Sequence, residues 1–356
     1  METRTLAGAE YRVRGERFKP CRILVIKLRL IGDVLLATPV FAGLRRAFPE
    51  ARISACVSGG TETILENDPN VDEVFAGTFP AGSSNRWKKE VELFRRVRRG
   101  RYDLVLDLTT SDRSAILTRA TGAARRIGYV SHKGFWGRSR FYTERVQALS
   151  GEHMVLKHCR MFEALEIKVN EPKLVFPLSD EHRRLVQELL PSRDFFQVHP
   201  ISRVPAKNWP AAFMAEVVNA IARARGWVPV ITGSADAQEQ KGISEIKSLL
   251  RCEHVDVSGK LTLKQLGAVS ERAKFYLGVD TAPMHIAAAV GTPVVALFGP
   301  SNERLWAPWC EKSLVLSREL DCRLPCKNKE CQTVHCLREF TPATVLPKID
   351  QFIQAL

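Results

Sequence analysis

One carboxylate, Asp33, is placed where it could act as a general base. It follows an apolar run, residues 21–28, that is typical of a strand buried on both faces of a parallel sheet. Ligands of open α/β sheets bind beyond the carboxyl ends of the strands, and Gly32 allows a tight turn at that point. The alternative is that Asp33 only caps the next helix. The sequence leaves both roles open, a proton acceptor or a helix cap.

A second polar segment, suited to binding phosphate, follows the first apolar run of the second half of the chain. Residues 199–210 (HPISRVPAKNWP) place a hydroxyl, Ser202, and a cation, Lys207, on a loop between a strand and a helix. A lysine offers a point charge to a phosphate, and the N–H groups at the start of the next helix would add to it. The segment is not a Walker A loop, because the chain has no G-x-x-x-x-G-K-[ST] pattern.

A third segment, residues 278–289 (GVDTAPMHIAAA), combines an acidic residue, small residues and a histidine. Asp280 and Thr281 are typical of a helix start, and small side chains such as Ala282 let a diphosphate approach the free N–H groups. His285 lies one turn further on and is either a ligand or a core or capping histidine. The G-x-G-x-x-G fingerprint is absent, which argues against an NAD or FAD cofactor.

Alternating strand and helix patterns position these three segments and predict an α/β fold with parallel sheets. The first half is expected to contain a helix at residues 33–48 and strands at 21–28, 52–57 and 103–108. The pattern restarts after a linker at 172–177, with a helix at 180–190 and strands at 195–199, 228–232, 275–279 and 293–298. A chain of 356 residues is long enough for two such domains. We expect an arm at residues 1–20, domains at 21–175 and 176–340, and a terminal amphipathic helix at 341–356.

The positive charge is concentrated in the first half of the chain. The net charge is +14; residues 1–178 hold 31 basic and 20 acidic residues, whereas residues 179–356 hold 22 and 19. Two segments, 86–101 and 125–145, interleave basic and aromatic residues, and in the first of them Trp87, Val91 and Phe94 recur at helical spacing. This asymmetry indicates an anionic partner, and nucleic acid, an acidic membrane surface and a phosphorylated substrate remain open beside a merely solvated basic face.

The remaining composition sets limits on class and compartment. No run approaches the roughly 18 apolar residues that a membrane span needs, and the first 20 residues have no signal-peptide pattern, so we expect a cytoplasmic protein. Its nine cysteines are then expected to be thiols or metal ligands rather than disulfides. Four of them could hold zinc, with His335 as an alternative ligand, but without a C-x-x-C pair free thiols are favoured over a metal: Cys322, Cys326, Cys331 and Cys336.

The three polar segments together resemble one family. LVIKLRLIGDVLLATPVFAGLRRAFPEARI, HPISRVPAKNWP and GVDTAPMHIAAAVGTPVVALFGPSNERLW are similar to the ADP-heptose:lipopolysaccharide heptosyltransferases, a glycosyltransferase family of GT-B architecture. The resemblance covers about residues 21–355, and the cysteine-rich stretch is most similar to the heptosyltransferase III branch. It implies two Rossmann-like domains with parallel sheets facing across a cleft, the acceptor on the N-terminal domain and the nucleotide sugar on the C-terminal one. The implied reaction is inverting transfer of heptose from ADP-heptose to the inner core of lipopolysaccharide, with no cofactor and no metal.

The same resemblance assigns roles to individual residues. Asp33, in the family's G-D motif, corresponds to the catalytic base. The implied donor-binding residues are Ser202, Lys207, Asp236, Leu261, Asp280, Thr281, Ala282 and His285. Of these, Asp236 lies near the expected ribose contact, Leu261 lies where the backbone cradles adenine, and Ala282 stands where the family often has glycine. The residues expected to bind the acceptor are Lys27, Arg29, Arg138 and Arg140.

Two further functions compete with this interpretation. A basic two-domain nucleic-acid-binding protein explains the pI of about 9.5 but not Asp33, Lys207 or the 280–285 helix start. An NAD-dependent oxidoreductase is disfavoured by the missing glycine fingerprint. The transferase interpretation predicts no nucleic-acid partner, and it adds peripheral contact between the basic segments and the anionic inner face of the inner membrane.

Overall fold

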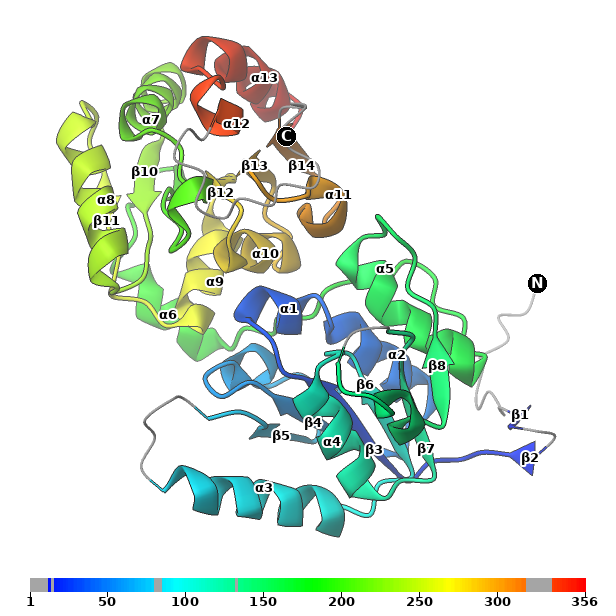
Figure 1. Ribbon diagram of the computed structural model, residues 1–356. Helices are drawn as coiled ribbons and strands as arrows, with labels where there is room; N and C mark the ends of the chain where they lie inside the picture. The colour runs from blue at the N-terminus through cyan, green and yellow to red at the C-terminus, as the bar shows by residue number, and fades with distance from the viewer. Residues whose placement is uncertain (1–11, 14–15, 80–84, 132–133, 318–334) are drawn as a thin grey trace, which may run out of the picture. The chain divides into compact units, whose positions relative to one another are not determined.

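The computed structural model describes residues 12–13, 16–79, 85–131, 134–317 and 335–356, and the chain divides into two compact units, 1–175 and 176–356. Each unit contains a parallel six-stranded sheet (Figure 1). The α/β class with two parallel sheets is therefore confirmed. No helix in the described ranges is long and apolar enough to cross a membrane.

The sheet of the N-terminal unit has the strand order β5-β4-β3-β6-β7-β8. Its strands are β3 (Arg22–Lys27), β4 (Arg52–Val57), β5 (Glu73–Ala76), β6 (Leu104–Asp107), β7 (Arg125–Tyr129) and β8 (Glu144–Val146). All neighbouring pairs are parallel. The order is that of a Rossmann sheet, whose direction of winding reverses between β3 and β6. A separate short hairpin precedes the sheet, β1 (Arg12–Val13) with β2 (Glu16–Arg17).

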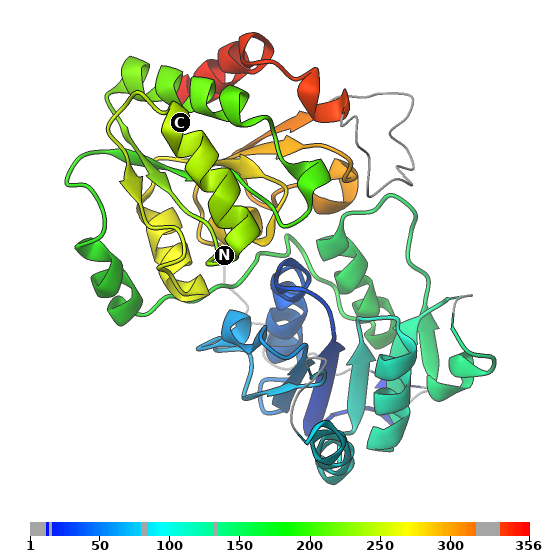
Figure 2. The same cartoon turned by 60° about the vertical axis from the view of Figure 1, so that its left-hand side comes forward.

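Helices cover both faces of this sheet (Figures 1 and 2). On one face, α3 (Arg86–Arg99) and α4 (Asp112–Thr121) pack against β3 and β6 through a cluster that includes Leu24, Ile26, Leu93, Val97, Val105 and Leu117. The other face is covered by α2 (Thr38–Ala47) and α5 (Met154–Cys159), and α2 buries Val40, Phe41 and Leu44. Burial on both faces explains why β3 is apolar along nearly its whole length.

The single helix predicted over residues 33–48 is in fact two helices, and the prediction was wrong on this point. They are α1 (Ile31–Leu35) and α2, which starts at Thr38 with Pro39 in its first turn. Proline lacks the N–H that would continue the hydrogen-bond ladder of α1. The Thr38 hydroxyl instead donates to the Leu35 carbonyl at 2.8 Å. The break confines α1 to little more than one turn beside the end of β3.

The C-terminal unit repeats the same topology, with the order β11-β10-β9-β12-β13-β14. Its strands are β9 (Phe195–His199), β10 (Val228–Ile231), β11 (Val255–Asp256), β12 (Tyr276–Val279), β13 (Val294–Phe298) and β14 (Ser313–Ser317). All neighbouring pairs are again parallel. The reversal point therefore lies between β9 and β12, the strands that precede the second and third polar segments.

Two helical layers enclose this second sheet (Figure 2). One apolar cluster joins it to α7 (Ala211–Arg225), α8 (Ala237–Leu249) and α13 (Pro342–Gln354). Two further clusters join it to α6 (Asp180–Gln187), α9 (Leu263–Arg272) and α10 (Ala282–Ala289). The short helices α11 (Glu303–Trp306) and α12 (His335–Arg338) complete the unit, and the buried Trp209 Nε1 donates to the Leu337 and Phe340 carbonyls.

Candidate active site

Asp33 lies at the reversal point of the first sheet, in the first turn of α1. The N-cap of α1 is Leu30, and no side chain caps this helix, so the alternative in which Asp33 serves as a cap does not apply. The carboxylate instead forms an ion pair with Lys27, the last residue of β3, with 3.2 Å between Nζ and Oδ1. The Asp33 side chain keeps 17% of its exposure, whereas Lys27 as a whole keeps 2%. Asp33 is thus accessible, and its partner is buried behind it.

A buried hydrogen-bond network at the carboxyl end of β6 lies next to Asp33 and Lys27, because β6 is the neighbour of β3 in the sheet. Leu28 N donates to Thr109 Oγ1 at 2.7 Å, and Thr109 N donates to Asp107 Oδ1 at 2.8 Å. The other carboxylate oxygen of Asp107 accepts from Tyr142 at 2.6 Å, and burial raises the pKa of Asp107. The next residue along, Thr110, has a φ of 60°, a left-handed conformation that β-branched residues seldom adopt and that concentrates at functional sites.

Sequence analysis missed this network, because it treated residues 103–108 only as a strand. The available signal was the polar residues Asp107, Thr109 and Thr110, interrupted only by Leu108, at the carboxyl end of an apolar segment. Polar residues at that end of a parallel strand are typical of ligand sites.

The other basic residues expected near the acceptor differ in accessibility. Arg29 is exposed and donates to the Thr109 carbonyl at 3.4 Å. Arg140, in the short 3₁₀ helix η2 (Arg138–Phe141), is exposed and lies over the ring of Trp136, which keeps 89% of its exposure. Arg138 is buried and pairs with Asp112 at 3.0 Å, so its guanidinium is already engaged within the fold. The four expected acceptor residues thus divide into two accessible cations and two buried ones.

The second site lies at the reversal point of the C-terminal sheet and joins two of the predicted segments. Lys207 ends the 3₁₀ helix η4 (Pro205–Lys207) after β9, and Asp280 directly follows β12. Their side chains form an ion pair of 2.6 Å between Nζ and Oδ2. Asp280 is buried, whereas the Lys207 side chain keeps 27% of its exposure. Lys207 can therefore meet a ligand while its ammonium stays fixed by Asp280.

Asn208 organises the loop that carries Lys207 and Ser202. Its Oδ1 accepts from Ser202 N at 2.7 Å, and its Nδ2 donates to the Ser202 carbonyl at 3.0 Å. The Ser202 hydroxyl accepts from Val204 N at 3.1 Å. These bonds close the loop into a fixed turn, so that the positions of the hydroxyl and the ammonium are set together. Sequence analysis quoted Asn208 within the segment but gave it no role.

The helix start expected at residues 280–283 is α10, whose N-cap is Thr281 and whose first turn contains Pro283. No side chain caps it. Pro283 has no N–H and Met284 N donates to the Thr281 carbonyl at 3.1 Å, so Ala282 supplies the first-turn N–H that lacks a capping side chain. His285 is buried within α10. Helix α10 is eight residues long, and its start lies beside the Lys207 ammonium. It therefore has the features of a helix N-terminus that binds an anion.

The two remaining donor predictions have different surroundings. Asp236 is the N-cap of α8, where its Oδ1 accepts from the N–H groups of Gln238 and Glu239. Leu261 is partly buried against an apolar cluster in the loop before α9. Sequence analysis missed Glu239, a buried carboxylate that accepts from Ser234 N at 2.9 Å and pairs with Arg203 at 3.3 Å. Its position three residues after a helix cap, typical of a capping box, was the available signal.

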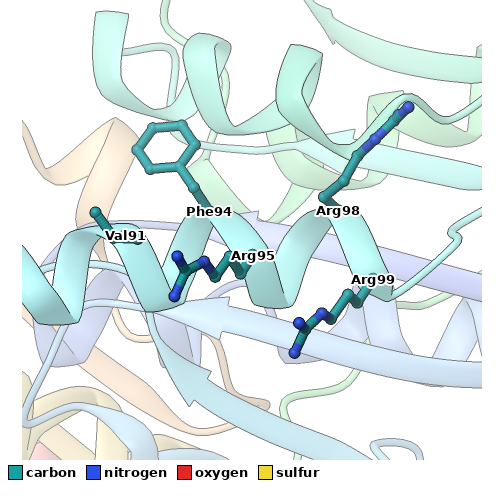
Figure 3. Close-up of a pocket in the computed structure, with 5 residues that line it drawn as sticks. All are labelled: Val91, Phe94, Arg95, Arg98 and Arg99. Atoms are coloured by element: carbon teal, nitrogen blue, oxygen red, sulfur yellow. The ribbon is translucent and has the colours of Figure 1, made fainter.

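A third surface lies on the solvent side of α3, in the N-terminal unit. A shallow hollow of about 460 Å³ is lined by Val91, Phe94, Arg95, Arg98 and Arg99, which project from successive turns (Figure 3). Trp87 extends the apolar stripe by one turn and keeps 66% of its exposure. Within the described ranges, these three arginines form no ion pair, unlike Arg96, which pairs with Glu73.

The structure gives no support to a metal centre among the residues that it describes, where no group of three candidate ligands comes together. Of the four cysteines of the possible zinc site, Cys322, Cys326 and Cys331 lie outside the described residues, as does the side chain of His335. Cys336 lies within the described residues, where it is partly buried against the large apolar cluster of the C-terminal unit.

Comparison with known proteins identifies the family. The family model described as glycosyltransferase family 9 (heptosyltransferase) matches residues 91–336, which is more than half of the chain. The chain belongs to glycosyltransferase family 9. This heptosyltransferase chain is 30% identical over 294 residues to lipopolysaccharide heptosyltransferase 3 of Escherichia coli strain K12, covering 80% of the chain and 84% of that relative. Another E. coli lipopolysaccharide heptosyltransferase 3 is 28% identical over 92% of the chain and 97% of the relative.

A solved structure supports the fold of this family 9 protein. The structure of E. coli ADP-heptose LPS heptosyltransferase II has a TM-score of 0.74 and 23% identity, and it covers 94% of this chain and 99% of that one. The family resemblance drawn from the three polar segments is confirmed, including its similarity to the heptosyltransferase III branch. The individual site residues and the cleft between the two domains stay predictions.

Proposed function

We propose that the chain transfers heptose from ADP-heptose to the inner core of lipopolysaccharide, with inversion at the anomeric carbon. The observation that carries the proposal is that a chain of family 9 has two polar sites, one in each unit. Each site lies at the reversal point of a Rossmann-type sheet. One site offers a carboxylate, Asp33, and the other a lysine, Lys207, beside a helix start. The names of the relatives, lipopolysaccharide heptosyltransferases 3, support the choice of substrates.

The C-terminal unit is proposed to bind the donor. The diphosphate of ADP-heptose meets the Lys207 ammonium and the backbone N–H groups of Thr281 and Ala282 at the start of α10, which has no side-chain cap. Negative charge grows on the ADP oxygen as the sugar leaves, and these groups are preorganised to stabilise it. The same groups can offset the charge that a divalent cation offsets in other transferases, so the proposed reaction needs no metal. Ser202, Asp236, Leu261, Asp280 and His285 remain the proposed lining of this site.

The N-terminal unit is proposed to bind the acceptor and supply the base. The acceptor hydroxyl attacks C1 of the heptose while the bond from C1 to the phosphate oxygen breaks, and its electron pair leaves with ADP. The hydroxyl proton passes to the Asp33 carboxylate. Arg29 and Arg140 are the accessible cations that could meet the acidic groups of the core oligosaccharide. Lys27 and Arg138 are buried, and each forms an ion pair within the fold, with Asp33 and Asp112 respectively.

Calorimetry and a transfer assay test the proposal together. The chain is titrated with ADP-heptose, NAD and duplex DNA at physiological salt, and it is then incubated with ADP-heptose and a series of truncated lipopolysaccharides. The expected result is binding of ADP-heptose alone and transfer to one truncation product. Binding of NAD or DNA without ADP-heptose binding would overturn the proposal in favour of an oxidoreductase or a nucleic-acid-binding protein.

We propose further that the basic N-terminal unit contacts an anionic membrane surface through α3. Its outer face combines an apolar stripe of Trp87, Val91 and Phe94 with the cations Arg95, Arg98 and Arg99. Figure 3 shows all of these side chains except Trp87. Helices with this composition lie in the plane of the interface, with aromatic rings at the acyl boundary and basic side chains at the headgroups. Each cation near an anionic surface contributes about 1 kcal/mol. Such a contact would bring the enzyme to a lipid-linked acceptor.

Liposome binding tests this surface. The triple variant Arg95→Gln, Arg98→Gln, Arg99→Gln is expected to bind phosphatidylglycerol vesicles about 100-fold more weakly, with unchanged ADP-heptose affinity. A matched control removes the same charge from the C-terminal unit, at three of its exposed cations: Arg223, Lys241 and Arg251. Equal loss in both triple variants would mean that net charge, rather than α3, governs vesicle binding. Retained binding in the α3 variant would refute the contact.

A further inference from the structure

The ion pair between Lys27 and Asp33 combines a buried cation with an accessible anion. The Lys27 ammonium lies 3.2 Å from Asp33 Oδ1 and donates to the Leu108 carbonyl at 3.5 Å, so it bridges α1 and the end of β6. In the part of the chain that the structure describes, the ion pair engages Oδ1 and leaves Oδ2 with no hydrogen-bond partner. The carboxylate is thereby held by one oxygen and open at the other.

We propose that Lys27 is a positioning residue for the catalytic base: it holds Asp33 in one rotamer through Oδ1 and leaves Oδ2 to take the proton of the acceptor hydroxyl. The inference rests on the proposed role of Asp33. It replaces the expectation that Lys27 binds the acceptor directly, because a side chain that is 3% exposed has almost no surface to offer a sugar.

The environment of Lys27 is unfavourable for a cation, which is the physical argument for a functional role. Burying an ammonium is costly, and an apolar side chain of similar length would pack in its place at no such cost. The favourable contacts that Lys27 gains are the Asp33 carboxylate and one carbonyl group. The desolvation cost of the Lys27 ammonium is explained if catalysis requires the Asp33 carboxylate to be held in one orientation.

The charges that face Lys27 come from three elements. Asp33 of α1 is the anion, Arg29 lies on the loop between β3 and α1, and Lys157 and His158 lie on α5. Burial lowers the pKa of Lys27 to about 8, with Asp33 opposing this effect and the two neighbouring cations adding to it. His158 is itself buried, and burial holds its pKa well below the ordinary value, so it is neutral when Lys27 titrates. The ammonium that orients Asp33 is therefore lost a little above neutral pH.

The pH dependence of turnover tests this role in the full-length enzyme. Steady-state kcat and KM are measured from pH 6 to pH 9.5 with ADP-heptose and a truncated lipopolysaccharide, for the wild type, Lys27→Arg and Lys27→Met. We expect kcat of the wild type to fall above about pH 8. Arginine keeps its charge, so Lys27→Arg should lose this alkaline limb. Lys27→Met should lower kcat about 10- to 100-fold at pH 7 and abolish the limb, with unchanged ADP affinity.

The matched control is Lys157→Met, which removes a neighbouring cation outside the ion pair and is expected to keep wild-type kcat. Circular dichroism of each variant establishes that it is folded. Wild-type kcat and an unchanged alkaline limb in Lys27→Met would overturn the inference. The proposed function fails in a different way: the wild type would not transfer heptose, or Asp33→Asn would keep full turnover.

Discussion

Lys27 makes the stability of the N-terminal unit depend on pH in a direction that the structure specifies. Burial lowers its pKa from the ordinary 10.5 to about 8, despite the opposing attraction of Asp33. The unfolded chain keeps the proton up to about pH 10.5, so between pH 8 and 10.5 the unfolded state binds more protons than the folded state. The free energy of unfolding therefore rises with pH across this window. One pKa unit corresponds to about 1.4 kcal/mol, so the protonated lysine destabilises the folded unit by about 3 kcal/mol below pH 8.

Lys27→Met removes this destabilisation while keeping a side chain of similar length. The variant is expected to unfold with a free energy up to about 3 kcal/mol higher than that of the wild type at pH 7, less the lost hydrogen bond to the Leu108 carbonyl. The attraction of Asp33 is already included in the lowered pKa. The advantage should shrink from pH 8 upward and vanish near pH 10.5, where the lysine is neutral in both states. Stability would thus increase in the same variant in which turnover decreases, the usual relation where a strained group serves function.

Urea denaturation with pulse proteolysis provides the measurement, because fragments of the two units can be read separately by mass spectrometry. The C-terminal unit serves as an internal reference that the substitution should not change. A lower free energy of unfolding in Lys27→Met at pH 7 would refute the reasoning, since Lys27 would then stabilise the fold as an ordinary ion pair. A difference between variant and wild type that stays constant from pH 7 to pH 10.5 would contradict the lowered pKa.

Three further outcomes are expected. Asp33→Asn should lower kcat about 10²- to 10⁴-fold with nearly unchanged ADP-heptose affinity, and because Asp33 does not cap α1 the fold should persist; wild-type turnover would refute the base assignment. Lys207→Ala should weaken ADP binding about 10- to 100-fold by calorimetry, and EDTA should leave turnover intact, whereas a loss restored by Mg²⁺ would contradict the metal-free reaction. Arg140→Gln should raise KM for the acceptor, while Arg138→Gln should mainly lower the melting temperature because Arg138 pairs with Asp112; the reverse pattern would contradict their assigned surroundings.

Much of the fold could be predicted because it depends on local patterns. The apolar run at residues 21–28 and the shorter segment 195–199 (FFQVH) both form strands that helices cover on two faces, and the positions predicted for them are confirmed. The break between α1 and α2 was not predicted, because the apolar periodicity continues across it. Pro39 was the available signal, since proline cannot continue the hydrogen-bond ladder of α1. The three polar segments were recognisable because each directly follows a strand, and the chain order alone sets that relation.

The pairing of charged side chains could not be predicted, because it depends on which strands become neighbours. Asp107 and Thr109 follow Lys27 by about eighty residues, and only the adjacency of β3 and β6 brings them to one site. In the same way, the adjacency of β9 and β12 brings Lys207 to Asp280. Sequence determined which residue types end each strand, and tertiary structure decided which of them are buried and paired. The roles of Lys27 and Arg138 changed for that reason: the solvation of a cation is set by the elements that pack over it, and no pattern local to the residue records them.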